Sequence, residues 1–233
     1  MEIHKLTDES PKNPNCDDKS SHKNETVLKI TAIKQGLKNP NRVNVFVNGD
    51  FAFSLSIAQV VDLGIRKGRV ITADELAEYR QASEFGKLYQ RTLEWVLVRP
   101  RAIRETKDYL FEKLRKSSEN SSAVSQTIIE RLCDKGYLND AEFARWYVEN
   151  RFVKKGVSRK RLRMELVKKG VAVDIIDEVL DGRNDEEEIR KMIARKSAKY
   201  DDSQKLIAYL CRQGFSYDLV CELVRGDEGL NAT

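Results

Sequence analysis

An internal repeat constrains the fold of this 233-residue chain more than any other feature of its sequence. When the chain is shifted by 44 positions, a pattern of apolar residues and one glycine falls on a second copy of itself. The matched residues are Leu162, Leu166, Gly170, Asp174, Ile176, Glu178 and Leu180 on Leu206, Leu210, Gly214, Asp218, Val220, Glu222 and Val224. Apolar residues three and four apart indicate helices, and a glycine between two such runs indicates a turn. Each copy therefore predicts two helices joined by a turn.

An earlier and less regular copy precedes these two. Its apolar positions are Leu110, Leu114, Ile128, Ile129 and Leu132. The loop between its two helices, at about 117–122, is five residues longer than in the later copies. A further amphipathic segment belongs to each copy, which makes three helices per unit, and such units bury their apolar faces by stacking on their neighbours.

These observations predict a mainly α-helical fold, a tandem array of three three-helix repeats with about nine helices. The repeats are expected at about 83–136, 137–182 and 183–226, followed by a C-terminal tail at 227–233. The residues expected in turns are Pro100, Gly136, Gly156, Gly170, Gly182, Gly214 and Gly226. The residues expected to cap helix N-termini are Asn139 with Glu142, Ser158 and Ser216. A generic helical bundle whose segments match by chance is the alternative.

The residues before 83 have a different character. Residues 1–25 are polar, with almost nothing to bury, so we expect a disordered tail. From Val27 onward apolar and polar residues alternate, and Asn48-Gly49 lies between two such runs. An Asn-Gly pair in this position is the strongest short-range signal for a hairpin with a type I′ turn. Residues 26–82 therefore predict a small β-hairpin-containing α+β module.

Two helices are expected to begin toward the end of this module. One begins at Ser56 and ends at Leu63, where Gly64 provides the left-handed residue that terminates many helices. Thr72 and Glu75 have the spacing of a capping box, which opens a second helix.

The distribution of histidine argues against most kinds of enzyme. His4 and His22 both lie in the polar tail, so residues 23–233 contain no imidazole that could act as a base or a metal ligand. Neither of the glycine-rich motifs that commonly hold nucleotide phosphates is present. We therefore predict a protein without catalytic residues and without a cofactor.

Carboxylate chemistry with a metal is the remaining enzyme hypothesis. Its candidate ligands are Asp181, Asp185, Glu186, Glu187 and Glu188. Consecutive carboxylates on a helix point around the axis and do not converge, whereas acidic residues at a helix N-terminus interact favourably with the helix dipole. We therefore favour a structural role for the run and predict no metal site.

The remaining composition indicates a soluble cytoplasmic protein, and we expect a monomer. No apolar run approaches the roughly 18 residues of a membrane-spanning helix, so we expect a soluble protein without a membrane partner. The cysteines form neither a disulfide framework nor a zinc motif, and reduced thiols are expected. They are Cys16, Cys133, Cys211 and Cys221.

Charge is segregated along the chain. The formal net charge is only +5, but 151–169 contains nine basic residues and one acidic residue, Glu165. Immediately downstream, 174–188 contains eight carboxylates and one basic residue, Arg183. Arg159 and Arg163 lie four residues apart on the predicted helix, so like charges are neighbours. An anionic partner would offset this repulsion, and the alternative is a solvated helix face.

A basic helical surface fits either nucleic-acid phosphates or an acidic protein surface. Trp146 and Tyr147 could stack on single-stranded bases, but their spacing from Phe143 is typical of a helix core. We therefore assign them to the core.

One stretch resembles a known family. It contains Lys135-Gly136-Tyr137-Leu138-Asn139-Asp140, then Phe143-Ala144, Tyr147-Val148, Arg151, Gly156, Leu162, Glu165-Leu166 and Lys168-Lys169-Gly170. With Arg99-Pro100-Arg101 before it, the pattern resembles the RecX family, regulators of the bacterial RecA recombinase. The resemblance covers about 86–225, and some members carry an N-terminal extension similar to the β-rich module. Two residues depart from the family pattern: Ala102 stands where a capping serine is usual, and Thr106 where a leucine is usual.

The resemblance implies a non-catalytic modulator that binds RecA and the RecA–DNA filament and restrains strand exchange and ATP hydrolysis in recombination and DNA repair. The expected core residues of the middle repeat are Phe143, Tyr147, Leu162, Leu166, Ile176 and Leu180. The expected contact residues for RecA or DNA are Arg99, Arg101, Arg104, Arg151, Lys154, Lys155, Arg159, Lys160, Arg163, Lys168 and Lys169. A stand-alone DNA-binding module that uses the basic middle repeat is the alternative function.

Overall fold

The computed structural model describes residues 27–37, 39–115, 121–200 and 202–231, and within them all side chains except those of 152–155, 198 and 227–231. The predicted tail at 1–25, with both histidines and Cys16, lies outside the described residues. Contacts divide the chain into two compact units between Ser83 and Glu84. We call these unit 1 and unit 2.

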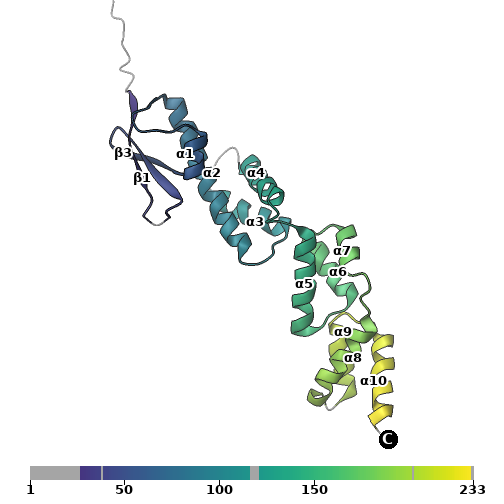
Figure 1. The fold of residues 1–233 in the computed structure, drawn as a ribbon. Coiled ribbons are helices and arrows are strands. Elements are labelled where there is room, and N and C mark those ends of the chain that lie inside the picture. Colours follow the sequence, from purple (N-terminus) through teal and green to yellow (C-terminus); the bar gives the residue numbers. More distant parts are fainter. Residues whose placement is uncertain (1–26, 38, 116–120, 201, 232–233) are drawn as a thin grey trace, which may run out of the picture. The chain divides into compact units, whose positions relative to one another are not determined.

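Unit 1 contains a four-stranded antiparallel sheet (Figure 1). Its strands are β1 (Leu28–Gln35), β2 (Arg42–Val47), β3 (Asp50–Ser56) and β4 (Val70–Ile71), in the order β3-β2-β1-β4. Asn48 and Gly49 join β2 to β3 with φ values of 51° and 97°. Positive φ at both central residues is what a type I′ turn requires, so the predicted hairpin is confirmed.

The helices of unit 1 begin where the sequence predicts. Helix α1 (Ile57–Asp62) starts with a capping box between Ser56 and Gln59, and Gly64 follows it with a φ of 58°. Helix α2 (Ala73–Leu97) starts at the predicted Thr72–Glu75 box, in which each residue's side chain accepts the other's backbone N–H. The buried apolar residues of this unit come from one face of the sheet and the segments beside it. They are Ile30, Val45, Val47, Phe53, Leu55, Ile65, Ile71 and Tyr79.

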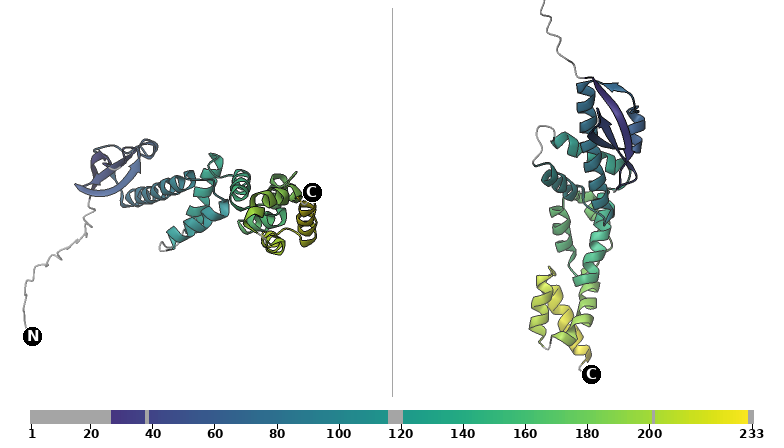
Figure 2. Two further views of the ribbon diagram at one scale, coloured as in Figure 1. Left: turned by 90° about the horizontal axis from the view of Figure 1, so that it is seen from below. Right: turned by 90° about the vertical axis from the view of Figure 1, so that its left-hand side faces the viewer.

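Unit 2 is helical, and the predicted three three-helix repeats are confirmed. Repeat 1 contains the end of α2 with α3 (Ile103–Leu114) and α4 (Ser121–Asp134). Repeat 2 contains α5 (Asp140–Lys155), α6 (Arg159–Lys168) and α7 (Val173–Val179). Repeat 3 contains α8 (Asp185–Lys196), a short 3₁₀ turn (Ser197–Lys199), α9 (Ser203–Arg212) and α10 (Tyr217–Asn231). The helices of each repeat lie beside one another in both views of Figure 2, and each repeat has its own buried cluster.

The residues that define the sequence repeat occupy equivalent places. Leu162, Leu166, Ile176 and Leu180 are buried, as are their counterparts Leu206, Leu210, Val220 and Val224. Gly170 and Gly214 end the equivalent helices with φ values of 84° and 94°. The periodicity therefore reflects a shared packing pattern.

Three details of the sequence prediction need correction. Gly226 lies inside α10, because that helix continues through the predicted C-terminal tail to Asn231. Glycine lowers helix stability by only about 1 kcal/mol, which is too little to end a helix by itself. Ser121 and Ser122, expected in a loop, form the first turn of α4. Tyr147, expected in the core, is only half-buried. Its ring packs against Phe143, and its hydroxyl donates to the carboxylate of Glu165.

Candidate partner-binding surface

The basic middle repeat contains an ion-pair network centred on Glu165 of α6. Arg151 of α5 donates from Nη2 to Oε1 at 2.6 Å and from Nε to Oε2 at 2.9 Å. Arg161 donates to the same carboxylate at 3.2 Å, and the Tyr147 hydroxyl donates at 2.9 Å. The hydrogen bonds from Arg151 are the main reason that the pKa of Glu165 falls to about 2. The same bonds raise the pKa of Arg151. Arg151 therefore links α5 to α6, and this role is structural.

The acidic stretch that follows the basic segment neutralises part of it. Arg163 of α6 makes two hydrogen bonds to the carboxylate of Asp177 in α7. Arg145 of α5 lies 3.6 Å from Glu178. A carboxylate of the same repeat therefore already pairs with Arg163, and a contact between Arg163 and an anionic partner stays a prediction.

Three more of the predicted contact residues lie at or beside the junction of repeats 1 and 2. They are Arg99, Arg101 and Lys169. Glu105 of α3 accepts from Lys169 at 2.6 Å and from Arg99 at 3.2 Å. Burial alone would raise the pKa of Glu105, but these two cations hold it below its ordinary value. The Arg99 guanidinium also lies 5.2 Å from the centre of the Trp146 ring. Arg101 stacks on Trp95 at 3.8 Å, and burial lowers the pKa of its guanidinium.

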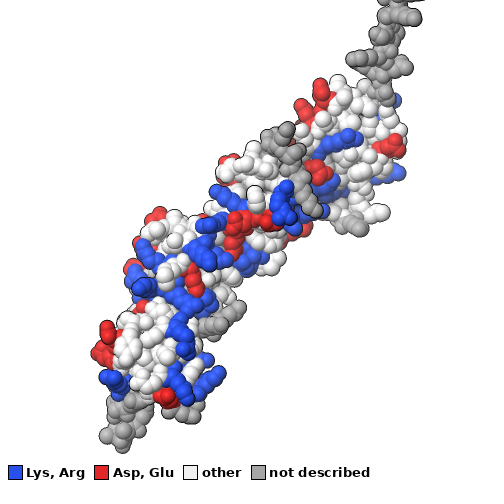
Figure 3. Space-filling model, turned by 180° about the vertical axis from the view of Figure 1, so that it is seen from behind, with Lys and Arg blue, Asp and Glu red and all other residues white. Residues whose placement is uncertain are grey.

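The remaining cations are more accessible. Arg104, Arg159, Lys160 and Lys168 have exposed side chains, and no ion pair is formed by any of them within the described residues. The backbone N–H of Arg159 donates to Asp185 at 2.7 Å, but its side chain lies at the surface. The side chains of Lys154 and Lys155 lie outside the described residues. On the side of unit 2 seen in Figure 3, many Lys and Arg side chains lie near one another, with Asp and Glu between them.

We define the open basic surface as Arg104, Arg159, Lys160 and Lys168. This surface has fewer residues than the sequence predicts, because several of the predicted cations form ion pairs with carboxylates on other helices. Its members belong to two repeats, since Arg104 is on α3 and the other three are on α6. A surface of this kind can bind phosphates or carboxylates without any catalytic group.

The same arrangement of backbone contacts joins successive repeats. Asp140, the first residue of α5, accepts the backbone N–H of Ile103 at 2.9 Å, and Asp185, the first residue of α8, accepts that of Arg159. Both aspartates were noted in the sequence, but their role in joining successive repeats was not predicted from it. The available signal was an Asn-Asp pair at the start of the first helix in repeats 2 and 3, at Asn139 and Asn184.

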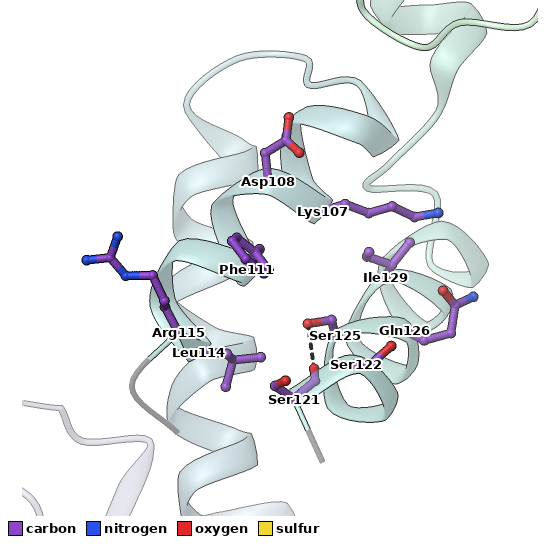
Figure 4. Close-up of a pocket in the computed structure, with 10 residues that line it drawn as sticks. All are labelled: Lys107, Asp108, Phe111, Leu114, Arg115, Ser121, Ser122, Ser125, Gln126 and Ile129. Carbon is purple, nitrogen blue, oxygen red and sulfur yellow. Dashed lines mark hydrogen bonds between the residues drawn. The ribbon is translucent and has the colours of Figure 1, made fainter. Parts of the chain in front are cut away.

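The first repeat contains an open groove of about 700 Å³ between α3 and α4 (Figure 4). When the buried residues of the two repeats are aligned, Lys107 and Ile129 fall where Arg163 and Asp177 form their ion pair. Lys107 and Ile129 cannot form an ion pair, so no such contact closes the groove between α3 and α4. Phe111 lies at this groove with 66% of its surface exposed.

The acidic run at 185–188 forms the first turn of α8, as favoured from the sequence. Asn184 caps this helix, and Glu188 lies 3.6 Å from Arg183.

Among the described residues, no group of three or more His, Cys, Asp or Glu side chains is placed to hold a metal ion. Cys133, Cys211 and Cys221 are free thiols. None of the described helices has the length and apolar character needed to cross a membrane.

Comparison with known proteins connects both units to one family. Residues 28–72 match the model of the regulatory protein RecX N-terminal domain, and 139–180 match the model of the RecX second three-helix domain. The first of these matches falls on the β-rich module, so this module is also a feature of the family.

Three curated relatives carry the name Regulatory protein RecX. The protein from Listeria monocytogenes serotype 4b (strain F2365) is 30% identical over 201 residues, which cover 82% of this chain and 73% of the relative. The Bacillus subtilis (strain 168) protein is 30% identical over 200 residues, with 82% and 74% covered. The Clostridium perfringens (strain SM101 / Type A) protein is 31% identical over 208 residues, with 84% and 95% covered.

A solved structure has the same fold. A crystal structure described as regulatory protein RecX aligns with a TM-score of 0.64 and 22% identity, and covers 85% of this chain and 99% of that chain.

Proposed function

Because the chain belongs to the RecX family of regulatory proteins, we propose that it binds the RecA recombinase and the RecA–DNA filament and mostly inhibits ATP hydrolysis and strand exchange. This activity would place it in homologous recombination and DNA repair. Binding would suffice for such a role, without a catalytic step in the chain itself.

The observation that carries the proposal is the open basic surface. Its four cations are exposed on α3 and α6, while several neighbouring cations are used in ion pairs within the chain. None of these four cations forms an ion pair within the described residues, so an anionic partner is able to neutralise them. We propose that acidic surfaces or phosphates of the filament contact these residues.

The proposal is tested by titrating the protein into a DNA-dependent RecA ATPase assay. The wild-type chain is expected to suppress ATP hydrolysis, and the double variant R159E/K160E is expected to require a higher concentration for the same suppression. K205E is the matched control, because Lys205 is exposed on α9 and lies outside the open basic surface. ATP hydrolysis that stays unchanged through the wild-type titration contradicts the proposal.

The alternative, a stand-alone DNA-binding module, rests on the same four cations. It predicts tight binding to naked DNA that weakens steeply with salt, without any requirement for RecA.

A further inference from the structure

The sheet of unit 1 has one face that its buried core does not use. Side chains alternate between the two faces of a strand, and Ile30, Val45, Phe53 and Leu55 point into the core. The strand register places the alternate positions on the opposite face, which we call the outer sheet face. Its residues are Lys29, Ala32, Lys34, Arg42, Asn44, Phe46, Phe51, Ser54 and Val70.

Two aromatic rings lie together on this face. Phe46 of β2 and Phe51 of β3 are paired across the hairpin, with ring centroids 6.1 Å apart and planes at 80°. The register shift between Val45 and Phe46 keeps both rings on the same side. Phe51 is 56% exposed, although burying an aromatic ring normally stabilises a small domain. An exposed, oriented ring is available for a partner.

Cations surround these rings. The Lys34 ammonium lies 5.1 Å from the centre of the Phe46 ring, and Lys29 is exposed on the same strand. Arg42 donates to the Ser54 hydroxyl at 3.2 Å and to the Ser54 carbonyl oxygen, so its guanidinium is held on the face. None of the described residues at outer-face positions is Asp or Glu. The face therefore combines aromatic rings with an excess of positive charge.

We propose that the outer sheet face binds single-stranded nucleic acid. A base would stack on Phe51, and the phosphates on either side would lie near Lys34 and Lys29. Proteins bind single strands by this combination of aromatic rings and cations, because every base has a face that can stack and every nucleotide carries a charge. Duplex bases are already stacked on each other, so a duplex would gain only the contribution of charge. This site goes beyond the proposed function, since it requires neither RecA nor the open basic surface.

The test measures binding of the full chain to fluorescent oligonucleotides of equal length: single-stranded DNA, single-stranded RNA, an abasic single strand and a DNA duplex. F51A should weaken binding to the base-containing single strands about tenfold, because one stacked base contributes roughly that much. The dependence of affinity on salt should not change, since no charge is lost. K34Q should instead lower the log-log salt slope by about 0.7, the value for one phosphate contact on a single strand. The DNA and RNA arms show which strand the face prefers.

Control variants distinguish base stacking on Phe51 from a general loss of binding and from binding by unit 2. F111A removes an exposed phenylalanine from unit 2, 66% exposed against 56% for Phe51, and should leave binding unchanged. F51W, which retains a ring that can stack, should restore affinity. R159E/K160E should leave the ratio of affinities for base-containing and abasic strands unchanged, because both residues lie on α6, outside the outer sheet face. The proposal is overturned if F51A binds all four oligonucleotides as the wild type does, or if it weakens binding to the abasic strand equally.

Discussion

Asp140 accepts the backbone N–H of Ile103 at 2.9 Å, so the first helix of repeat 2 caps the second helix of repeat 1. The residue that would ordinarily cap α3 is Ala102, which has no side-chain acceptor and is fully buried. A carboxylate from the next repeat therefore accepts one of the N–H groups that lack an intrahelical partner at the start of α3. The equivalent bond from Arg159 to Asp185 shows that the same device joins repeats 2 and 3.

Removing the acceptor at this junction should destabilise unit 2. D140A is expected to lower the free energy of unfolding by about 1 kcal/mol, the usual effect of losing a helix cap. D140N retains an acceptor oxygen without the buried charge and should remain close to the wild type. Chemical denaturation followed by circular dichroism measures both. Equal losses in D140A and D140N would show that the charge matters and the cap does not.

The network around Glu165 predicts a specific dependence of stability on pH. Its pKa is about 2 in the folded chain, below the ordinary value of a glutamate. A lowered carboxylate pKa stabilises the fold above the unfolded pKa, and this contribution is lost as the pH falls from about 5 toward 2. E165Q should lower the free energy of unfolding by about 2 kcal/mol at pH 7 and show a weaker loss of stability on acidification.

The control for this prediction is E187Q, since Glu187 has a side chain that is 68% exposed. Its effect at pH 7 should stay within about 0.5 kcal/mol. If E165Q and the wild type lose stability in parallel between pH 5 and pH 2, the network does not act as described.

A substitution at Gly214 tests how closely repeats 2 and 3 pack against each other. Its φ is 94°, and a Cβ atom there would lie 2.6 Å from the Ser158 hydroxyl and 3.0 Å from Cβ of Arg161. Gly136 also has a positive φ, 72°, but a Cβ there would meet nothing within 4 Å. Both G214A and G136A strain the backbone, so their difference isolates crowding between repeats 2 and 3. We expect G214A to be less stable than G136A by about 1–2 kcal/mol in thermal or chemical unfolding.

Structural and exposed cations should respond differently to neutralisation. R151Q removes the bidentate contact to Glu165 and should lower the free energy of unfolding by about 2 kcal/mol. R159Q and K160Q should change stability by less than about 0.5 kcal/mol, because their side chains are exposed. Filament binding, measured on folded protein, should weaken in R159Q and K160Q. Equal destabilisation in all three variants would argue against the division between structural cations and the open basic surface.

Local signals in the sequence predicted much of this fold. The Asn48-Gly49 hairpin and the Thr72–Glu75 box depend on a few adjacent residues, and the structure contains both. The repeat was visible because Leu166 and Leu210 fill equivalent buried positions. Gly226 was misread because a glycine ends a helix only where the backbone turns left-handed.

The contact surface was less predictable because ion pairs depend on tertiary structure. Glu165 looked like a single acid in a basic segment, but it binds Arg151 from the neighbouring helix. Asp177 belonged to an acidic stretch with no visible relation to Arg163. Charge counts along the chain located the basic region but did not show which of its cations are already paired.

The most direct test of the central claim is a salt-titrated comparison of binding to the RecA filament and to the same single-stranded DNA without RecA. The F51A chain is included so that a contribution of the outer sheet face to naked DNA is measured separately. We predict tighter binding to the filament at every salt concentration, weakened by R159E/K160E and not by K205E. Equal affinity for filament and naked DNA, with no effect of R159E/K160E on the filament, would contradict the account.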